Sequence, residues 1–242
     1  MTAGLCGSSA APRGARASRT IPTRISNGDT STSPLNTYLR TERTDYMAKY
    51  TKIPADTFKQ LQINAAIMLS DFTPASGEFD AANQIGATTG GINFTATPTF
   101  SDMGDDVDNC PKNTKELKLL DSWEAKCTGT MVTVTTASAK SMLAAADIGT
   151  SDTTKVTPRN DLSQADFDDL WIVGDYSDKN GPNNGGFIAI HMMNALSTGG
   201  FQMQTTDKAK GQFSFEYTAH YSISDQETVP FELYIKAGTD EA

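Results

Sequence analysis

The 242-residue sequence is poor in the residues that usually carry enzyme chemistry, with two histidines, three cysteines and two tryptophans. His191 falls in an apolar run and His220 on a polar strand face, and neither has a Ser, Cys or Asp at a spacing typical of a catalytic triad. We therefore expect both to be packed or surface strand residues. The sequence offers no catalytic residue, and an enzyme is the last of the readings considered below.

Cysteine usage gives no metal site either. Cys6, Cys110 and Cys127 form no C-x-x-C pair and have no histidine nearby, whereas structural zinc needs four clustered ligands. A Cys110–Cys127 disulfide would require an oxidising compartment, of which the sequence carries no sign. We expect reduced thiols and no cofactor.

Long apolar runs and basic residues are also scarce. No stretch of about 18 apolar residues exists, so we expect no membrane span. Residues 1–46 hold six arginines against three acidic residues, a net charge of +3, and the remaining 14 basic and 26 acidic residues give −12. Nucleic-acid affinity comes mostly from Lys and Arg, so a domain this acidic argues against specific DNA or RNA binding.

The first 46 residues differ from the rest in composition. They are rich in Ser, Thr, Ala, Gly, Arg and Pro and contain few large apolar side chains. No basic region followed by an apolar segment marks a secretory signal. We expect residues 1–46 to be a disordered arm or an extension created by a misassigned start at Met1, and residues 47–242 to be one domain.

Mass spectrometry of the N-terminus of natively expressed protein tests this expectation. A misassigned start predicts a mature chain that begins at or just after Met47. A mature chain beginning at Thr2 would contradict it.

Apolar and polar residues alternate in most of the remaining chain, which is typical of half-buried strands. The clearest case is 212–223, where Phe213, Phe215 and Tyr217 alternate with polar residues. Gly129 is expected to end one strand, and Pro98 to mark a sheet edge or a bulge. The expected strands lie within 58–69, 92–100, 117–127, 131–135, 170–176, 187–194, 201–205, 212–223 and 231–235.

One helix is expected over 139–148, with Ser138 as its N-cap and Gly149 as its end. Ser163 to Asp166 fits a capping box for a short turn. Hairpin-length connections then predict a mainly β domain, an antiparallel β-sandwich or partial barrel with one flanking α-helix.

The non-core faces of several expected strands carry Gln, Asn, Thr and Ser and few charges. Two explanations fit this pattern. The face is an ordinary solvated surface, or the sheet continues into a neighbouring subunit, since strand edges without lysine are open to pairing.

Asp102, Asp105, Asp106 and Asp108 form the densest acidic cluster. Their spacing does not match a calcium-binding EF-hand loop, so we expect a solvated acidic loop and no metal site. Gly185-Gly186 and Gly199-Gly200 lack the Lys-Ser or Lys-Thr of a phosphate-binding loop.

Residues 47–242 resemble the major tail (tail tube) proteins of long-tailed, non-contractile phages, particularly those of Gram-positive hosts. The similarity rests on four stretches and excludes residues 1–46. They are Met47-Ala48-Lys49-Tyr50 with the strand Phe58 to Ala65, Trp171-Ile172-Val173-Gly174-Asp175-Tyr176-Ser177, Asn194-Ala195-Leu196-Ser197-Thr198-Gly199-Gly200-Phe201, and Thr205-Thr206-Asp207-Lys208-Ala209-Lys210-Gly211 before the aromatic strand.

The resemblance implies a structural virion protein, assembled in the host cytoplasm, whose hexameric rings stack into the tail tube. Its implied partners are further copies of itself, the tape measure protein and tail terminator and tip proteins, with DNA crossing the lumen unbound. Residues 101–114 are long for a hairpin loop, so we expect them, with Asp102, Asp105, Asp106 and Asp108, to reach the next ring or subunit.

Two other functions stay open. One is a neck or tail-completion protein that forms a single ring. The other is a carbohydrate-binding β-sandwich, although a lectin should display exposed aromatic platforms and most aromatic residues here occupy alternating core positions.

Overall fold

A computed structural model describes residues 53–179, 181 and 185–240. The chain divides into two units, 1–52 and 53–242, and every described residue belongs to the second. The expected N-terminal arm, with the alternatives Met1 and Met47 for the start, therefore lies outside the described residues.

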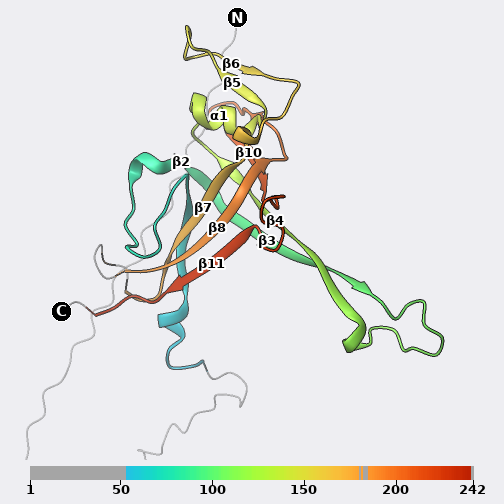
Figure 1. The fold of residues 1–242 in the computed structure, drawn as a ribbon. Helices are drawn as coiled ribbons and strands as arrows, with labels where there is room; N and C mark the ends of the chain where they lie inside the picture. Colours follow the sequence, from blue (N-terminus) through green and yellow to red (C-terminus); the bar gives the residue numbers. More distant parts are fainter. Residues whose placement is uncertain (1–52, 180, 182–184, 241–242) are drawn as a thin grey trace, which may run out of the picture. The chain divides into compact units, whose positions relative to one another are not determined.

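The described part of the second unit contains eleven antiparallel strands (Figure 1). Nine form one sheet in the order β2-β1-β7-β8-β10-β4-β3, with β11 paired to β8 and β9 to β10, and β5 and β6 pair separately. The bounds are β1 (Gln62–Leu69), β2 (Gln84–Gly86), β3 (Thr88–Asp102), β4 (Lys118–Met131), β5 (Ala146–Ile148), β6 (Val156–Pro158), β7 (Asp168–Tyr176), β8 (Gly186–Ser197), β9 (Gln202–Gln204), β10 (Gln212–Thr218) and β11 (Phe231–Lys236).

Strand β8 divides this sheet into two layers. Residues 186–192 pair with β7 on one side and β11 on the other, whereas Leu196 and Ser197 pair with β10. The first layer is β2, β1, β7, β8 and β11, and the second layer is β9, β10, β4 and β3. The expected mainly β sandwich with one flanking helix is confirmed.

The main core fills the space between the layers. Met68, Ile172 and Met192 come from the first layer, and Cys127 and Phe215 from the second. All five are almost fully buried, and burying one large apolar side chain contributes about 1.5–3 kcal/mol. The alternation expected for 212–223 holds through Ala219, and β10 ends at Thr218.

A smaller core covers the opposite face of the first layer. Phe72, in the segment after β1, packs edge-on against Trp171 and Phe187, with ring centroids 5.7 and 5.2 Å apart. Gly77 has a φ of +71°, and a Cβ there would lie 3.0 Å from the Phe187 ring, so glycine allows this segment to lie close to β8. The first layer is therefore apolar on both faces, and the second layer on one.

Gly129 does not end its strand, contrary to the expectation. It lies within β4 directly opposite Phe215, whose ring occupies the space where a Cβ would be, 2.6 Å from Phe215 Cζ. The strand ends instead at Met131, and the expected strand over 131–135 is wrong. Pro98 does lie in the edge strand β3, one residue before a register shift, as predicted.

The helix prediction was also partly wrong. Helix α1 (Thr136–Met142) is capped by Thr135, and Ser138 is the third helical residue of a capping box rather than the N-cap. Ala144 has a φ of +60°, which is incompatible with a continuing helix. The chain then forms β5 because Ala146 is buried and pairs with β6, so tertiary packing overrides helix propensity.

In strand β1, too, the alternation in the sequence does not give which side chains enter the main core. Asn64 has a φ of +66° and lies at a register shift between Ile63 and Ile67. This irregularity changes the phase of the alternation. Ala66 and Met68 therefore enter the main core, and Ile67 lies with the smaller core.

An arginine-centred cluster ties the β5–β6 pair to the turn before β7. The turn is the short helix η4 (Gln164–Asp166), where the predicted capping box is present. Asp166 is buried and accepts hydrogen bonds from the Ser163 amide at 2.8 Å and from Arg159 Nη2. Arg159 also pairs with Asp147 of β5 at 2.9 Å.

Replacing Asp166 by Ala should lower the free energy of unfolding by about 1–3 kcal/mol, since it leaves the Ser163 amide and one arm of the Arg159 guanidinium without the buried carboxylate that they donate to. Urea denaturation measures the change. Asp161→Ala is the control, because that exposed carboxylate lies 4.0 Å from Arg159 and should contribute little. Equal losses in both variants would contradict the role of Asp166.

The same cluster predicts an acid-sensitive contribution to stability. The Ser163 amide and then Arg159 lower the pKa of Asp166 below its ordinary value of 3.8. A carboxyl whose pKa is lower in the folded state stabilises the fold at neutral pH, and this contribution is lost as pH falls below about 4. The stability difference between wild type and Asp166→Ala, measured by urea denaturation at each pH, should therefore shrink as the pH falls below about 4, to the part that does not depend on the charge of the carboxylate.

Candidate assembly surfaces

The outward face of the second layer is almost entirely polar, and we call it the polar sheet face. Its residues alternate with core residues, and the strand register aligns them in rows such as Thr95 beside Lys126 and Thr97 beside Glu124. The members are Asn93, Thr95, Thr97, Thr99, Ser122, Glu124, Lys126, Thr128, Thr130, Gln202, Gln204, Gln212, Ser214, Glu216 and Thr218. All are exposed or half-buried, so no other described element covers this face.

Three charged residues lie on the polar sheet face, and the single lysine offsets one of the two glutamates. Lys126 Nζ lies 2.6 Å from Glu124 Oε1, and the hydrogen bond and charge of Glu124 raise the pKa of the lysine. Glu216 accepts a hydrogen bond from the Thr198 hydroxyl at 2.9 Å. The polar sheet face thus consists mainly of hydroxyl and amide groups and has a local charge of −1.

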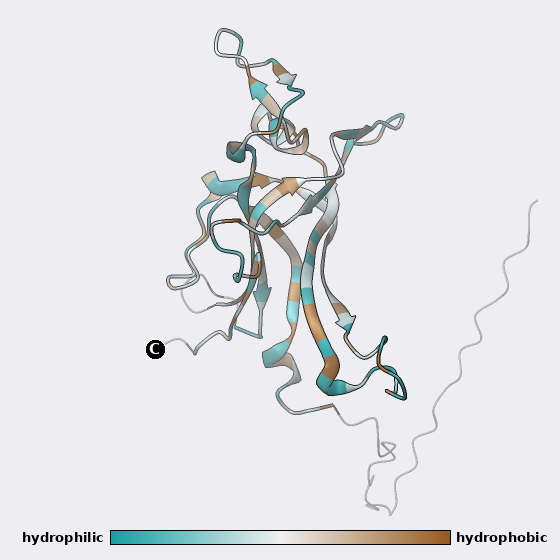
Figure 2. Ribbon diagram, turned by 45° about the vertical axis from the view of Figure 1, so that its right-hand side comes forward, coloured by the Kyte–Doolittle hydropathy of each residue, from teal (hydrophilic) through white to brown (hydrophobic). Residues whose placement is uncertain are grey.

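Beyond the sandwich, β3 and β4 continue as a projecting hairpin (Figure 1). Trp123 and Phe94 of the hairpin contact Phe231 of β11, with ring centroids 5.7 and 5.8 Å from that of Phe231. These are the outermost aromatic contacts between the hairpin and the first layer in the described residues. Further out, Phe100 and Leu120 pair across the strands on the core-facing side, yet they are 52% and 50% exposed. Figure 2 shows this hydrophobic stretch along the hairpin.

The four aspartates proposed as an assembly loop have different roles at the hairpin tip. Asp102 ends β3 and accepts hydrogen bonds from the amides of Gly104 at 3.0 Å and Asn113 at 2.8 Å. These two bonds lower the pKa of Asp102. The side chains of Asp105, Asp106 and Asp108 are exposed, so only Asp102 organises the turn.

Metal binding finds no support at this tip. Among residues 53–179, 181 and 185–240, no three His, Cys, Asp or Glu side chains are grouped so that they could hold a metal ion. The tip is instead tightly packed around Gly104, because a Cβ at this position would lie 2.9 Å from Cys110 Sγ and 3.0 Å from Leu117 Cδ1.

Strands β3 and β11 each have one hydrogen-bonding edge free in the described part of the chain. Strand β3 pairs with β4 alone, and β11 pairs with β8 alone. Neither edge carries the row of lysines that usually blocks pairing with another chain. Strand β9, on the far side of the second layer from β3, pairs with β10 alone.

The histidines have packing contacts, which the sequence alone did not show for His191. Its ring stacks on Trp171 with centroids 4.0 Å apart, and Nε2 lies 3.0 Å from Asp169 Oδ2. Leu170 of β7 lies directly opposite Met192 of β8, and Asp169 and His191 are the residues just before them in the sequence. The register of β7 and β8 is therefore the signal that could have predicted this contact. His220 packs edge-on against Phe167.

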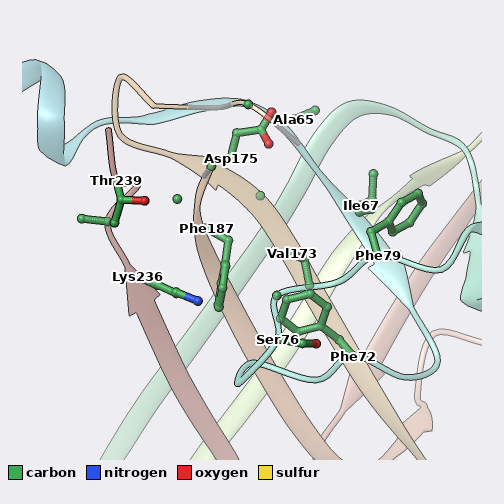
Figure 3. A pocket seen from close by; sticks show the side chains of 16 residues that line it. Ala65, Ile67, Phe72, Ser76, Phe79, Val173, Asp175, Phe187, Lys236 and Thr239 are labelled. Carbon is green, nitrogen blue, oxygen red and sulfur yellow. The ribbon is translucent and has the colours of Figure 1, made fainter. Parts of the chain in front are cut away.

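A cavity of about 590 Å³ lies between the segment after β1 and the outer face of the first layer (Figure 3). Phe72, Phe79 and Phe187 line it, together with Asp175 and Lys236. Lys236 Nζ lies 5.7 Å from the centre of the Phe187 ring, a cation–π contact, and Asp175 accepts a hydrogen bond from Asn64 at 3.2 Å.

Cys110 and Cys127 are both free, as expected. Cys127 is fully buried in the main core, and burial raises the pKa of its thiol to about 12. It is therefore protonated at neutral pH and acts as a small apolar residue. Cys6 lies outside the described residues.

Comparison with known proteins gives little further. No family model matches the sequence, and no curated protein matches it. A chain from a solved structure titled "Virion of native gene transfer agent (GTA) particle" is similar over 71% of this chain and 95% of that chain, with a TM-score of 0.36 and 7% identity. Such a remote likeness supports no conclusion about function. None of the helices in the described ranges is long and apolar enough to cross a membrane.

Replacing Asp102 by Ala should loosen the hairpin tip without unfolding the domain. The amides of Gly104 and Asn113 lose their acceptor, so their hydrogen exchange should become about tenfold faster. Asp106→Ala is the matched control, because its side chain is exposed and accepts none of these bonds. Unchanged exchange in Asp102→Ala would show that Asp102 does not hold the turn.

Proposed function

We propose that this protein is a structural virion protein, a subunit of a phage tail tube that assembles as rings stacked around a lumen. The polar sheet face is the single observation that carries this proposal. A buried core face behind it and free strand edges beside it are the arrangement that a sheet continued between subunits requires.

The composition of the polar sheet face suits a water-filled conduit. Water can satisfy its hydroxyl and amide side chains, and its three charged residues have a net charge of only −1. DNA in the lumen would meet no row of Lys or Arg that could displace its counterions, and the net charge of −12 over residues 47–242 would repel it. DNA would therefore pass without specific binding.

The free edges supply the means of ring closure. The second layer has β3 at one side and β9 at the other, so β3 of one subunit can pair with β9 or the adjoining end of β8 in the next. Such a contact is heterologous, and rotation of about 60° per subunit closes it into a hexamer. The tape measure protein and the tail terminator and tip proteins are the further partners of this role.

A carbohydrate-binding module is the second candidate, because of one observation that favours it. Phe79 is 53% exposed and lines the same cavity as Asp175, so one hollow offers an apolar ring and a carboxylate to a ligand. Within the virion class the alternative is a neck or tail-completion ring, which would use the same surfaces as a tube subunit.

Negative-stain microscopy of the purified full chain tests the proposal. Tubes or stacked rings are expected for the wild type, and deletion of 102–109 should leave a folded subunit, judged by circular dichroism, that forms no tubes. A triple Asp→Asn variant at positions 105, 106 and 108 keeps the length of the loop and removes its charge.

Each outcome is informative. Isolated rings would favour the neck or tail-completion reading, and monomers that bind glycans would favour the carbohydrate-binding reading. Normal tubes from the deletion variant would discard the assembly role of the loop while leaving the tube itself in place.

A further inference from the structure

We propose that two exposed apolar surfaces of the domain are the two halves of one contact between copies of this chain. The first is the cleft face, formed by Phe100 and Leu120 on the projecting hairpin and by Leu233 and Ile235 on β11. The second is the apolar segment, residues 53–61, with Ile53, Phe58 and Leu61. This inference rests on the proposed self-assembly and names the surfaces that meet.

The cleft face continues the core-facing sides of β11 and the hairpin beyond the place where these two elements cover each other. Phe231 contacts both Phe94 and Trp123, so the side of β11 that carries Phe231 faces the hairpin. Leu233 and Ile235 follow on the same side of β11, at the alternation of a strand. In Figure 1 β11 and the hairpin diverge beyond this point. Leu233 and Ile235 are each 55% exposed, so the layers no longer cover each other there.

The apolar segment shows the opposite geometry, a short protruding piece of chain before β1. Ile53 and Phe58 are 71% and 69% exposed, and Leu61 is 41% exposed. Its only charged residues, Asp56 and Lys59, pair with each other at 3.0 Å across the short helix η1 (Thr57–Gln60). The segment is thus apolar with no net charge.

Charge decides which part of a second copy fits the cleft face. The hairpin tip also exposes Met103 and Val107, but Asp105, Asp106 and Asp108 lie beside them. Asp121 and Glu232 border the cleft face against one basic residue, Lys118, whose Nζ lies 6.0 Å from the centre of the Phe100 ring. These three residues have a net charge of −1, so an acidic tip would still bring like charges together. The neutral apolar segment meets no such penalty.

The available area is sufficient for a specific contact. A phenylalanine side chain buries roughly 150–250 Å², and at the exposed fractions above the seven side chains offer on the order of 700 Å² of apolar surface. Specific interfaces bury about 1,200–2,000 Å² in total, polar rim included. The seven side chains with a polar rim around them reach the lower end of that range.

Because the two surfaces differ, the contact is heterologous and each subunit would use one surface toward each neighbour. Full-length Phe58→Asp should lose only the segment, and Leu233→Asp only the cleft face. Edge pairing between β3 and β9 stays possible in both variants, so by sedimentation velocity each variant alone should form smaller oligomers than the wild type under the same conditions. An equimolar mixture should recover part of the lost assembly, since each pair of the two variants can form one intact contact.

Leu162→Asp is the matched control, an exposed apolar position outside both surfaces that should assemble like the wild type. Circular dichroism checks that all variants are folded. If Phe58→Asp and Leu233→Asp assemble like the wild type, or if their mixture assembles no further than either variant alone, the inference is overturned while the proposed function stands. A wild-type chain that is itself monomeric would instead count against the proposed function.

Discussion

The arrangement of this domain depends on one strand that serves two layers. Strand β8 is hydrogen-bonded to β7 and β11 along most of its length and to β10 at its end. Because its last residues belong to the second layer, that layer is held over the first and the two apolar faces enclose one core. Ser197 at this junction also donates a hydrogen bond to the carbonyl of Met142, so the same strand fixes the end of α1.

This shared strand explains why the two layers differ in chemistry. The first layer is covered on both sides, by the main core and by the segment that carries Phe72, and its strands are apolar runs. The second layer is covered on one side only, and its strands alternate. The surfaces proposed for assembly are therefore consequences of which layer has a covering and where that covering stops.

The sequence predicted the fold class and most strands because alternation is a local property. Strands that follow one another in the predicted order do pair in the structure, 202–204 with 212–214 and β7 with β8. The prediction failed where contacts distant in sequence decide the local conformation. Gly129 continues a strand because Phe215 covers it, and Ala146 leaves a helix because it is buried against other elements. Neither effect is visible in a window of neighbouring residues.

The candidate surfaces were predicted to a similar extent. The polar residues of β3, β4 and β10 were recognised as an uncharged face, because period-two alternation places them together. The cleft face was not, since Phe100, Leu233 and Ile235 have the pattern of ordinary core residues. Their exposure depends on how far the opposite layer extends, which alternation does not encode. The acidic cluster was found as a group, but the special position of Asp102 depends on the fold of the turn.

The register shift near the end of the projecting hairpin has an evolutionary consequence. Thr99 opposes Ser122, but Phe100 opposes Leu120, so Asp121 is an additional residue in β4, held by a 2.7 Å hydrogen bond from Ser101. Loss of Asp121 alone would restore regular alternation and leave Leu120 opposite Phe100 on the same side of the hairpin. Loss of any other single residue from the outer part of either strand would move the side chains beyond it to the opposite side. Lineages of this protein should therefore tolerate loss of Asp121 far better than loss of one of its neighbours in the hairpin.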